Sequence, residues 1–379
     1  MKQCENFVHE RKLIPEGFQF FCEEPHPQSA QCLAAWIMHS CDELNLDSTV
    51  KDSTVERATF THAQKMRAAA TFGFGRIHGL GMQVWHRSEI TGKWAGNPSV
   101  SETLSCYMLS LRRRKTLKGE IATSARAITS TVIRQMHDFN NQPELQQPRN
   151  YGPTSRNNPD SKATDWAGPC ARALLNLGYA IAFCGLLRID ELLKIQIHDI
   201  AFEKIGDEYR LVLNLPLRKT SQFGDIKPFV FWKMPEEYIH LCVVDAYARW
   251  MVISELTSGF LFRKIRANDR IAEENEPMTS EKFLEMFRNN LVDIKLDHFP
   301  YGTHSFRRGG CQWLSVVRRW PLRQICEWGG WSKEFTHLTI VKYLISWNDN
   351  PTVDRDDFFN MNRAPTVACP TCNRTCHCA

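Results

Sequence analysis

The sequence predicts a mainly helical protein of two domains, the second of which carries a small antiparallel sheet. Three observations lead to this prediction. The chain has 379 residues, which is long for one domain at roughly 100–200 residues per domain. Apolar residues recur at helical spacing over most of the chain. Two apolar stretches flank a polar turn with Gly224, which predicts a hairpin at residues 211–231.

The composition excludes several classes of protein. Hydrophobic residues make up 43% and charged residues 23% of the chain, which excludes a wholly disordered, collagenous or low-complexity protein. The longest apolar stretch, residues 174–187, is well short of the roughly 20 residues that span a bilayer, so we expect a soluble protein without membrane contact. The N-terminus lacks the apolar run of a secretory signal, so export is not expected. The net charge of +5 is too small to identify a partner.

The first 120 residues predict a small helical domain behind a short lead-in. Residues 1–24 show no clear period and are expected to lie outside the core. Helices are expected at residues 31–45 and 59–74, and a third begins at Glu102 with Ser101 as its N-cap. The domain itself is therefore placed at residues 25–120.

The rest of the chain predicts a larger domain at residues 121–357 and a tail at 358–379. A helix is expected at residues 127–140. Residues 141–165 contain four prolines and many Asn, Gln and Ser residues, which predicts a loop. We then expect a helix at residues 166–196, strands at 209–215 and 227–231, and helices from Pro235 onward.

Basic residues gather in the smaller domain. Residues 101–127 contain six basic and two acidic side chains, and such an excess is typical either of a solvated helix end or of contacts with DNA phosphates. The basic residues of this domain include Lys65, Arg67, Arg76, Arg112, Arg113, Arg114, Lys115 and Lys118.

Two segments of the larger domain place cations where they need an explanation. Arg188 interrupts an apolar helical run and therefore needs a carboxylate or a phosphate partner. Glu191 lies three positions later, so a structural ion pair is one interpretation. Lys219 lies on the predicted hairpin, where a lysine is ordinarily just solvated.

Two further segments follow at residues 300–344. Thr303 is expected to cap a helix on which His304 and Arg307 share one face. Residues 304–324 contain five arginines and no carboxylate, which is hard to explain by surface ion pairs. The arginines beside Arg307 are Arg308, Arg318, Arg319 and Arg323. A Gly-Gly turn then leads to Trp331 and to a helix that carries Tyr343.

In this order, Arg, Lys, His-x-x-Arg, Trp and Tyr resemble the catalytic set of the tyrosine recombinases of the phage-integrase and Cre type. LLRIDELLKIQIHDI is similar to the first-arginine motif of that family, LRKT to its hairpin lysine, THSFRRGG to its His-x-x-Arg box and GGWS to its Gly-His or Gly-Trp motif. The resemblance covers roughly residues 25–350. The phrases HAQKMRAAATFGFG, SLRRRK and THSFRRGGCQW look most like the Crypton-type recombinases of fungal mobile elements.

The resemblance implies a fold and an activity. The fold is a helical, SAM-like core-binding domain followed by an α+β catalytic domain. The activity is cleavage and rejoining of DNA strands through a 3′-phosphotyrosyl link, without metal, ATP or another cofactor. The resemblance also implies double-stranded DNA as partner, a homodimer on each site, a homotetramer at synapsis, a role in integration or excision of a mobile element, and a nuclear location.

Each site residue then takes a role. Tyr343 is the nucleophile, Arg188 and Arg307 clamp the phosphate, and His304 and Trp331 donate further hydrogen bonds. His304 also helps to take the tyrosine proton, Lys219 protonates the leaving oxygen, and Glu191 orients the arginine or histidine. The resemblance also implies that the basic residues of the smaller domain face DNA, namely Lys65, Arg67, Arg76, Arg112, Arg113, Arg114, Lys115 and Lys118. Arg308, Arg318, Arg319 and Arg323 are expected to support the DNA clamp from the other side.

Some alternatives stay open. Trp331 stands where many members of the family have a second histidine, and Tyr343 follows it by 12 positions, more than in bacterial integrases. His337 and Tyr301 are competing candidates for the second histidine and the nucleophile. The chain could also be a domesticated DNA-binding protein that keeps the fold without turnover, or a topoisomerase-like enzyme that needs no synapsis.

The tail ends in CPTCNRTCHCA. Cys369, Cys372, Cys376 and Cys378 could hold zinc, but the second half is too compressed for the usual zinc knuckle or ribbon. A reduced tail without metal is the default expectation, and the ten other cysteines are expected to be buried hydrophobic residues.

Overall fold

The structure is a computed structural model of the whole chain, and it divides into two compact units, Met1–Ala122 and Thr123–Ala379. It describes residues 1–52, 54–120, 125–147, 150–152, 162–215, 226–331 and 339–344. The described part is mainly helical with small antiparallel sheets, which confirms the predicted fold class. The unit boundary lies two residues from the predicted one. No helix of the described residues is long and apolar enough to cross a membrane.

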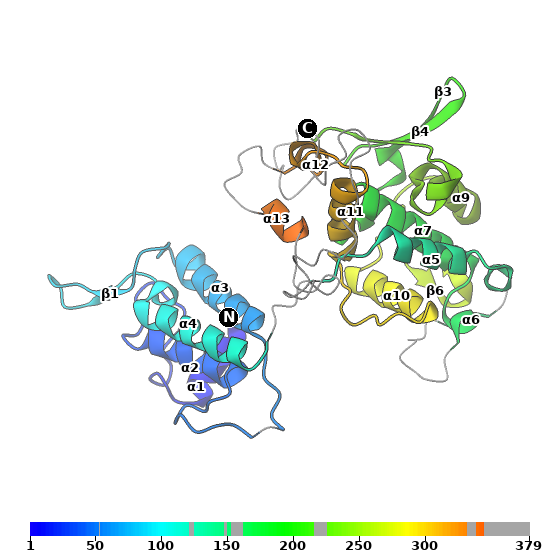
Figure 1. The fold of residues 1–379 in the computed structure, drawn as a ribbon. Helices are drawn as coiled ribbons and strands as arrows, with labels where there is room; N and C mark the ends of the chain where they lie inside the picture. Colours follow the sequence, from blue (N-terminus) through cyan, green and yellow to red (C-terminus); the bar gives the residue numbers. More distant parts are fainter. Residues whose placement is uncertain are drawn as a thin grey trace, which may run out of the picture. The chain divides into compact units, whose positions relative to one another are not determined.

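The first unit is a packed group of helices with a small hairpin (Figure 1). Its elements are α1 (Lys2–Glu10), α2 (Ser29–Cys41), α3 (Phe60–Phe72), the π-helical turn η1 (Gly73–Ile77), β1 (His86–Arg87), β2 (Trp94–Ala95), the 3-10 turn η2 (Pro98–Val100) and α4 (Glu102–Leu117). Helix α4 begins as predicted, because the Ser101 hydroxyl accepts a hydrogen bond from the Leu104 amide at 3.2 Å.

The lead-in belongs to the core of this unit, contrary to the prediction. Cys4, Val8 and Phe20 are fully buried, and Phe21 is nearly so. The Phe20 and Phe21 rings pack on the Phe74 ring with centroid distances of 5.6 and 4.7 Å. The sequence pattern missed this contribution because α1 is short and the two phenylalanines lie in irregular chain, where no period marks burial.

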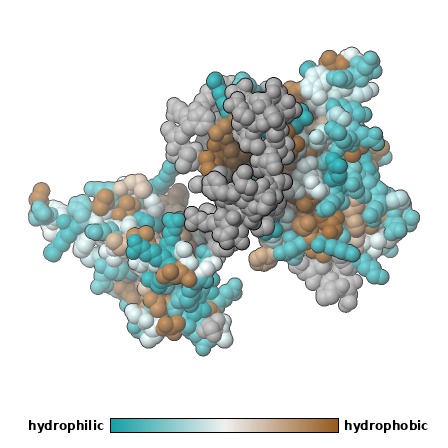
Figure 2. All heavy atoms as spheres, viewed as in Figure 1, coloured by the Kyte–Doolittle hydropathy of each residue, from teal (hydrophilic) through white to brown (hydrophobic). Residues whose placement is uncertain are grey.

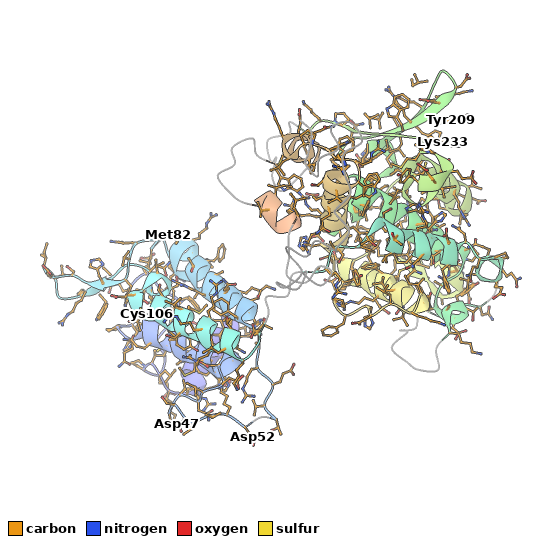
Figure 3. All side chains as sticks on the ribbon, viewed as in Figure 1. Asp47, Asp52, Met82, Cys106, Tyr209 and Lys233 are labelled. Atoms are coloured by element: carbon orange, nitrogen blue, oxygen red, sulfur yellow. The ribbon has the colours of Figure 1, made fainter. Side chains whose placement is uncertain are left out.

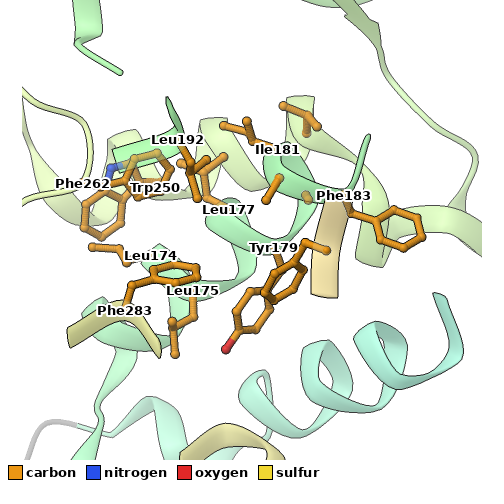
Figure 4. Close-up of a cluster of buried hydrophobic side chains, with 14 of the residues drawn as sticks. Leu174, Leu175, Leu177, Tyr179, Ile181, Phe183, Leu192, Trp250, Phe262 and Phe283 are labelled. Carbon is orange, nitrogen blue, oxygen red and sulfur yellow. The ribbon is translucent and has the colours of Figure 1, made fainter. Parts of the chain in front are cut away.

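The second unit is built around one buried helix. Its described helices and turns are α5 (Ser130–Asn140), η3 (Pro143–Gln146), α6 (Ala163–Trp166), α7 (Pro169–Cys184), α8 (Ile189–Leu193), η4 (Ile197–Asp199), η5 (Glu236–Leu241), α9 (Val243–Ser254), η6 (Ala267–Asp269), α10 (Ser280–Asp293), α11 (Ser305–Val316), α12 (Leu322–Trp328) and α13 (Thr339–Leu344). Helix α7 packs against α5, α9 and α11, and its Leu174, Leu177 and Phe183 side chains are fully buried in the core (Figure 4).

A three-stranded antiparallel sheet lies at one side of α9. It consists of β3 (Ile200–Ile205), β4 (Glu208–Leu213) and β5 (Phe229–Trp232), in that order. Strands β4 and β5 were predicted, whereas β3 was not. The Lys233 amide continues the ladder by donating to the Tyr209 carbonyl at 2.9 Å. Both residues are labelled in Figure 3. A second pair, β6 (Ile265–Arg266) and β7 (Arg270–Ile271), is shorter.

The visible face of each unit is mostly hydrophilic with scattered hydrophobic residues (Figure 2).

One ion pair lies fully inside the second unit. Arg172 and Asp293 have no exposed side-chain surface, and an Arg172 amine stands 3.2 Å from an Asp293 carboxylate oxygen. The same guanidinium donates to Asn140 Oδ1 at 2.7 Å and to the Ala163 carbonyl at 2.7 Å. The Trp166 indole donates to Asp293 at 3.1 Å. This network joins α5, α6, α7 and α10.

The Asp293→Ala variant is expected to lose about 3–5 kcal/mol of unfolding free energy, because it leaves the Arg172 guanidinium buried without its counter-charge. Urea denaturation of the purified protein measures this loss. Glu285→Ala is the matched control, since Glu285 lies on the same helix and forms a partly exposed pair with Lys282. A loss in Asp293→Ala no larger than in Glu285→Ala would contradict the stabilising role.

Candidate functional site

Arg188 lies at the break between two helices, α7 and α8. The sequence predicted one helix over residues 166–196, but α7 ends at Cys184 and α8 begins after Arg188. Leu186 adopts a left-handed conformation with φ of 51°, which ends the helical path. The Arg188 amide donates to Glu191 Oε2 at 3.0 Å, and its guanidinium donates to Glu191 Oε1 at 2.7 Å. The ion pair considered for these two residues is therefore present.

Helix α11 places Arg307 on the other side of the same carboxylate. Arg307 is fully buried, and its Nη1 lies 3.7 Å from Glu191 Oε2. Glu191 therefore holds two guanidinium groups from two separate segments. Their charges lie close together, which is an arrangement suited to a doubly contacted anion. Arg188 keeps 22% of its side-chain surface exposed, so it lies at the mouth of the cluster.

His304 begins α11. It is the N-cap residue, with no side-chain capping bond, and the predicted Thr303 cap is not formed. The Ser305 hydroxyl instead accepts from the Gly302 amide at 3.0 Å. The His304 side chain is exposed, yet the protein atoms around the ring desolvate it and lower the pKa of His304. The positive charges of Arg307 and Arg188 lower this pKa further.

Two aromatic rings face Arg307. The centre of its guanidinium lies 4.5 Å from the Trp331 ring and 5.1 Å from the Tyr343 ring. The two rings lie 5.5 Å apart at an interplanar angle of 43°. Among the described residues, nothing accepts a hydrogen bond from the buried Trp331 Nε1. A buried donor without a partner costs free energy, and it is a suitable donor to an anion held by the arginines.

Six of the predicted site residues therefore lie close together: Arg188, Glu191, His304, Arg307, Trp331 and Tyr343. Lys219 and the competing candidate His337 lie outside the described residues. The other competitor, Tyr301, is buried, and burial raises the pKa of its hydroxyl. Its ring lies 6.0 Å from the Arg126 guanidinium.

The basic residues of the first unit fall into two groups. Lys65, Arg76, Arg112 and Arg113 are exposed. Arg67 and Arg112 line a groove of about 440 Å³ between α3 and α4, together with Gln64, Ser105 and Leu109. Arg67 is anchored there, since it donates to the Ser99 carbonyl at 3.0 Å and to the Ser105 hydroxyl at 2.8 Å.

The second group is engaged within the unit. Arg114 donates to Asp42 Oδ1 at 3.1 Å, and Lys118 lies 3.1 Å from Glu43. Lys115 does not lie on the surface, contrary to the expectation for a DNA contact. Its amine is buried and donates to the Ala58 carbonyl at 3.0 Å. The basic residues of α4 and its C-cap therefore serve partly to hold the segment between α2 and α3.

In the second unit, Arg308 is likewise buried rather than exposed, which corrects its expected placement. It donates to the Ala125 carbonyl at 2.6 Å. A backbone hydrogen bond joins the same two segments, because the Ile128 amide donates to the Ser305 carbonyl at 3.1 Å. Arg318 is exposed over the Trp313 ring at 5.8 Å, and Arg319 is partly buried in a left-handed conformation.

The predicted cysteine ligands of the tail lie outside the described residues. Within the described residues, no group of three or more His, Cys, Asp or Glu side chains gathers as a metal site would. Cysteines of the described part are mostly buried, as expected. One contact at the site was missed by sequence reasoning: Gln312 on α11 donates to the Leu344 carbonyl at 3.0 Å. No local signal marks it, because the two residues are 32 positions apart.

No protein-family model and no curated protein matches the chain. Solved structures do align with it. One is the XerH site-specific recombinase bound to its palindromic difH substrate, with a TM-score of 0.47 and 13% identity over 94% of this chain and 74% of that one. A lambda integrase dimer bound to a COC′ core site has a TM-score of 0.36 and 11% identity, over 89% and 93%. The FLP recombinase in a Holliday junction complex has 0.34 and 10%, over 94% and 82%.

Proposed function

We propose that the chain is a site-specific DNA recombinase that cleaves and rejoins strands through Tyr343. The observation that carries this proposal is the group of side chains around Glu191. Two guanidinium groups share this carboxylate, and the inner one faces both a tyrosine ring and an indole whose N–H has no acceptor among the described residues. Cations, a neutral donor and a hydroxyl nucleophile are the groups that phosphoryl transfer to a protein requires.

The proposed reaction exchanges one phosphodiester bond for another. The Tyr343 oxygen attacks the phosphorus, the bond to the 5′ oxygen breaks, and the phosphate stays joined to the 3′ side and to the tyrosine. The tyrosine proton leaves to a base, and the 5′ oxygen takes up a proton as it departs. Because the new ester keeps the bond energy, the reverse attack by a 5′-hydroxyl reseals the strand without ATP.

The charge of the phosphate oxygens rises toward the transition state. Arg188 and Arg307 clamp the two non-bridging oxygens, and Trp331 Nε1 adds a donor. Each such contact is worth roughly 3–4 kcal/mol of barrier by comparison with other oxyanion donors. His304, neutral because of its lowered pKa, takes part in removing the tyrosine proton. Lys219 on its hairpin protonates the leaving oxygen.

The proposed partner is double-stranded DNA. The exposed Lys65, Arg76, Arg112 and Arg113 of the first unit and Arg318 of the second supply the phosphate contacts. The finer parts of the proposal rest on the sequence motifs: a dimer on each site, a tetramer at synapsis, a Crypton-type mobile element as the source, and the nucleus as the location.

Binding is expected to weaken steeply with salt. If six or more phosphates are neutralised, affinity falls roughly 10³-fold or more between 50 and 200 mM salt. Fluorescence anisotropy with a labelled duplex at several salt concentrations measures the slope. An affinity that does not change with salt would contradict the clamp.

The rate of cleavage is expected to depend on pH through His304. Its pKa lies below 6.5, the usual value, so the ring is neutral at neutral pH and becomes protonated only in more acidic solution. We expect the rate to rise with pH through this lowered pKa and then to level off. Single-turnover rates between pH 5 and pH 8 measure the profile. We expect the rise of the rate with pH to be absent in His304→Gln. The same rise in this variant would assign the titration to another group.

The reaction class is tested by a suicide substrate. Nicked duplexes from the ends of the encoding element are incubated without metal and separated on a denaturing gel. A slower band that disappears on protease treatment is expected. The short strand released by cleavage diffuses away, so the strand cannot be resealed and the covalent complex is trapped. Salt-sensitive binding without such a band on any end sequence would overturn the enzymatic proposal and leave a DNA-binding protein. A requirement for two sites distinguishes a recombinase from a topoisomerase-like enzyme.

A further inference from the structure

Helix α13, which carries Tyr343, depends on other parts of the chain for its position. It has six residues, and so short a helix is not stable in water by itself. Its last carbonyls lack partners within the helix. One of them, the Leu344 carbonyl, accepts a hydrogen bond from the side-chain amide of Gln312 at 3.0 Å.

Apolar contacts hold one face of the same helix. Ile340 is 4% exposed and lies in a buried cluster with Cys311, Leu314, Ile325 and Cys326. Tyr343 and Leu344 pack against this cluster. Such contacts are not directional, so they allow the helix to slide or rotate slightly. A hydrogen bond has a preferred distance and direction, so the bond from Gln312 fixes the end of the helix next to Tyr343.

Gln312 and Arg307 lie on one rigid element. Both belong to α11, five positions apart, which is roughly 7.5 Å along a helix axis. The Tyr343 ring lies 5.1 Å from the Arg307 guanidinium. The helix that holds the phosphate clamp therefore also holds the end of the helix that bears the nucleophile, within the same chain.

We infer that Gln312 is a positioning residue for the nucleophile: its amide, by holding the Leu344 carbonyl, sets where the Tyr343 hydroxyl stands relative to the phosphate at Arg307. The inference rests on the proposed function of Tyr343 and Arg307. Gln312 itself does not touch the reacting atoms. Misplacement of a nucleophile by about 1 Å costs on the order of 10²-fold in rate.

The first test uses Gln312→Glu, which keeps the size of the side chain but cannot donate when ionised. Gln324→Glu is the matched control, because Gln324 is exposed on α12 and adds the same charge to the same unit. We expect the single-turnover rate of covalent complex formation to fall roughly 10- to 100-fold in Gln312→Glu and to stay within twofold in Gln324→Glu. Gln312→Lys, which keeps a donor, is expected to recover a part of the rate. An unchanged rate in Gln312→Glu would overturn the inference.

The second test separates positioning of the nucleophile from damage to the clamp. In a Tyr343→Phe background, hydrogen peroxide is supplied as the nucleophile: the hydroperoxide oxygen attacks phosphorus and the 5′ oxygen leaves with a proton. A small diffusing nucleophile does not depend on α13. Adding Gln312→Glu to Tyr343→Phe is therefore expected to leave the peroxide-dependent rate unchanged. A parallel loss of this rate would show that Gln312 supports the arginine clamp instead, and would overturn the inference.

The third test needs no activity. Hydrogen exchange at residues 340–344 is expected to be faster in Gln312→Glu than in the wild type and unchanged in Gln324→Glu, since only the former releases the end of α13. Equal exchange in all three proteins would overturn the inference. A wild type that shows no covalent complex while Gln312→Glu still speeds exchange would overturn the proposed function and leave the anchoring role standing.

Discussion

Tyr343→Phe is expected to abolish the covalent complex with nicked DNA while changing DNA affinity less than twofold. The substitution removes only the hydroxyl. The ring keeps its contacts with Trp331 at 5.5 Å and with Arg307 at 5.1 Å, so neither the fold nor the clamp should change. Denaturing gels measure the complex, anisotropy measures the affinity, and thermal unfolding verifies the fold.

Tyr301→Phe is the matched control for this prediction, because Tyr301 is the other tyrosine near α11 that was considered as nucleophile. It is buried, and its ring stands beside Arg126 rather than Arg307. We expect this variant to form the covalent complex at a rate close to that of the wild type. A complex that persists in Tyr343→Phe and is lost in Tyr301→Phe would reverse the assignment.

Arg307→Ala is expected to lower the rate of strand cleavage roughly 10²- to 10³-fold, the effect of about 3–4 kcal/mol of lost transition-state stabilisation. Arg307→Lys is expected to recover only part of the rate, because an ammonium cannot contact two phosphate oxygens in the fork geometry of a guanidinium. Single-turnover cleavage at saturating protein measures both. The rate is compared at equal occupancy, so that a change in binding does not count as a change in chemistry.

Arg318→Ala is the control for the loss of one positive charge, since Arg318 is exposed just beyond α11. We expect weaker binding with an unchanged rate at saturation. Because Arg307 is fully buried, urea denaturation must accompany the assay. A folded Arg307→Ala protein that cleaves at the wild-type rate would exclude Arg307 from the clamp.

Local sequence signals predicted the elements whose causes are local. Ser101 caps α4 as expected, and β4 and β5 lie where alternation placed them. The pairing of Arg188 with Glu191 also follows from a spacing of three positions. The spatial grouping of His304, Arg307, Trp331 and Tyr343 was implied by the resemblance of their motifs and not by periodicity.

Other features depend on distant contacts and could not be predicted. The break after Cys184 does have a local signal, because Gly185 at the C-cap is a common helix-ending residue, but the left-handed Leu186 that follows it is not a glycine and has none. Arg308 resembles a surface cation in sequence, but its side chain is buried and donates to the Ala125 carbonyl. The sequence gives no sign of this contact, because the two residues are 183 positions apart. Lys115 is directed inward in the same way by Ala58. A run of basic residues gives the sum of the charges, whereas only the fold decides which of them remain free for DNA.

The most direct measurement is identification of the residue that carries DNA in the trapped complex. The complex is digested with nuclease and protease, and the modified peptide is sequenced by mass spectrometry. We expect a nucleotide joined through a 3′-phosphate to the Tyr343 oxygen, in a peptide that contains the end of α13. A nucleotide on another residue, Tyr301 included, or a link through the 5′-phosphate would contradict the proposed chemistry at this site.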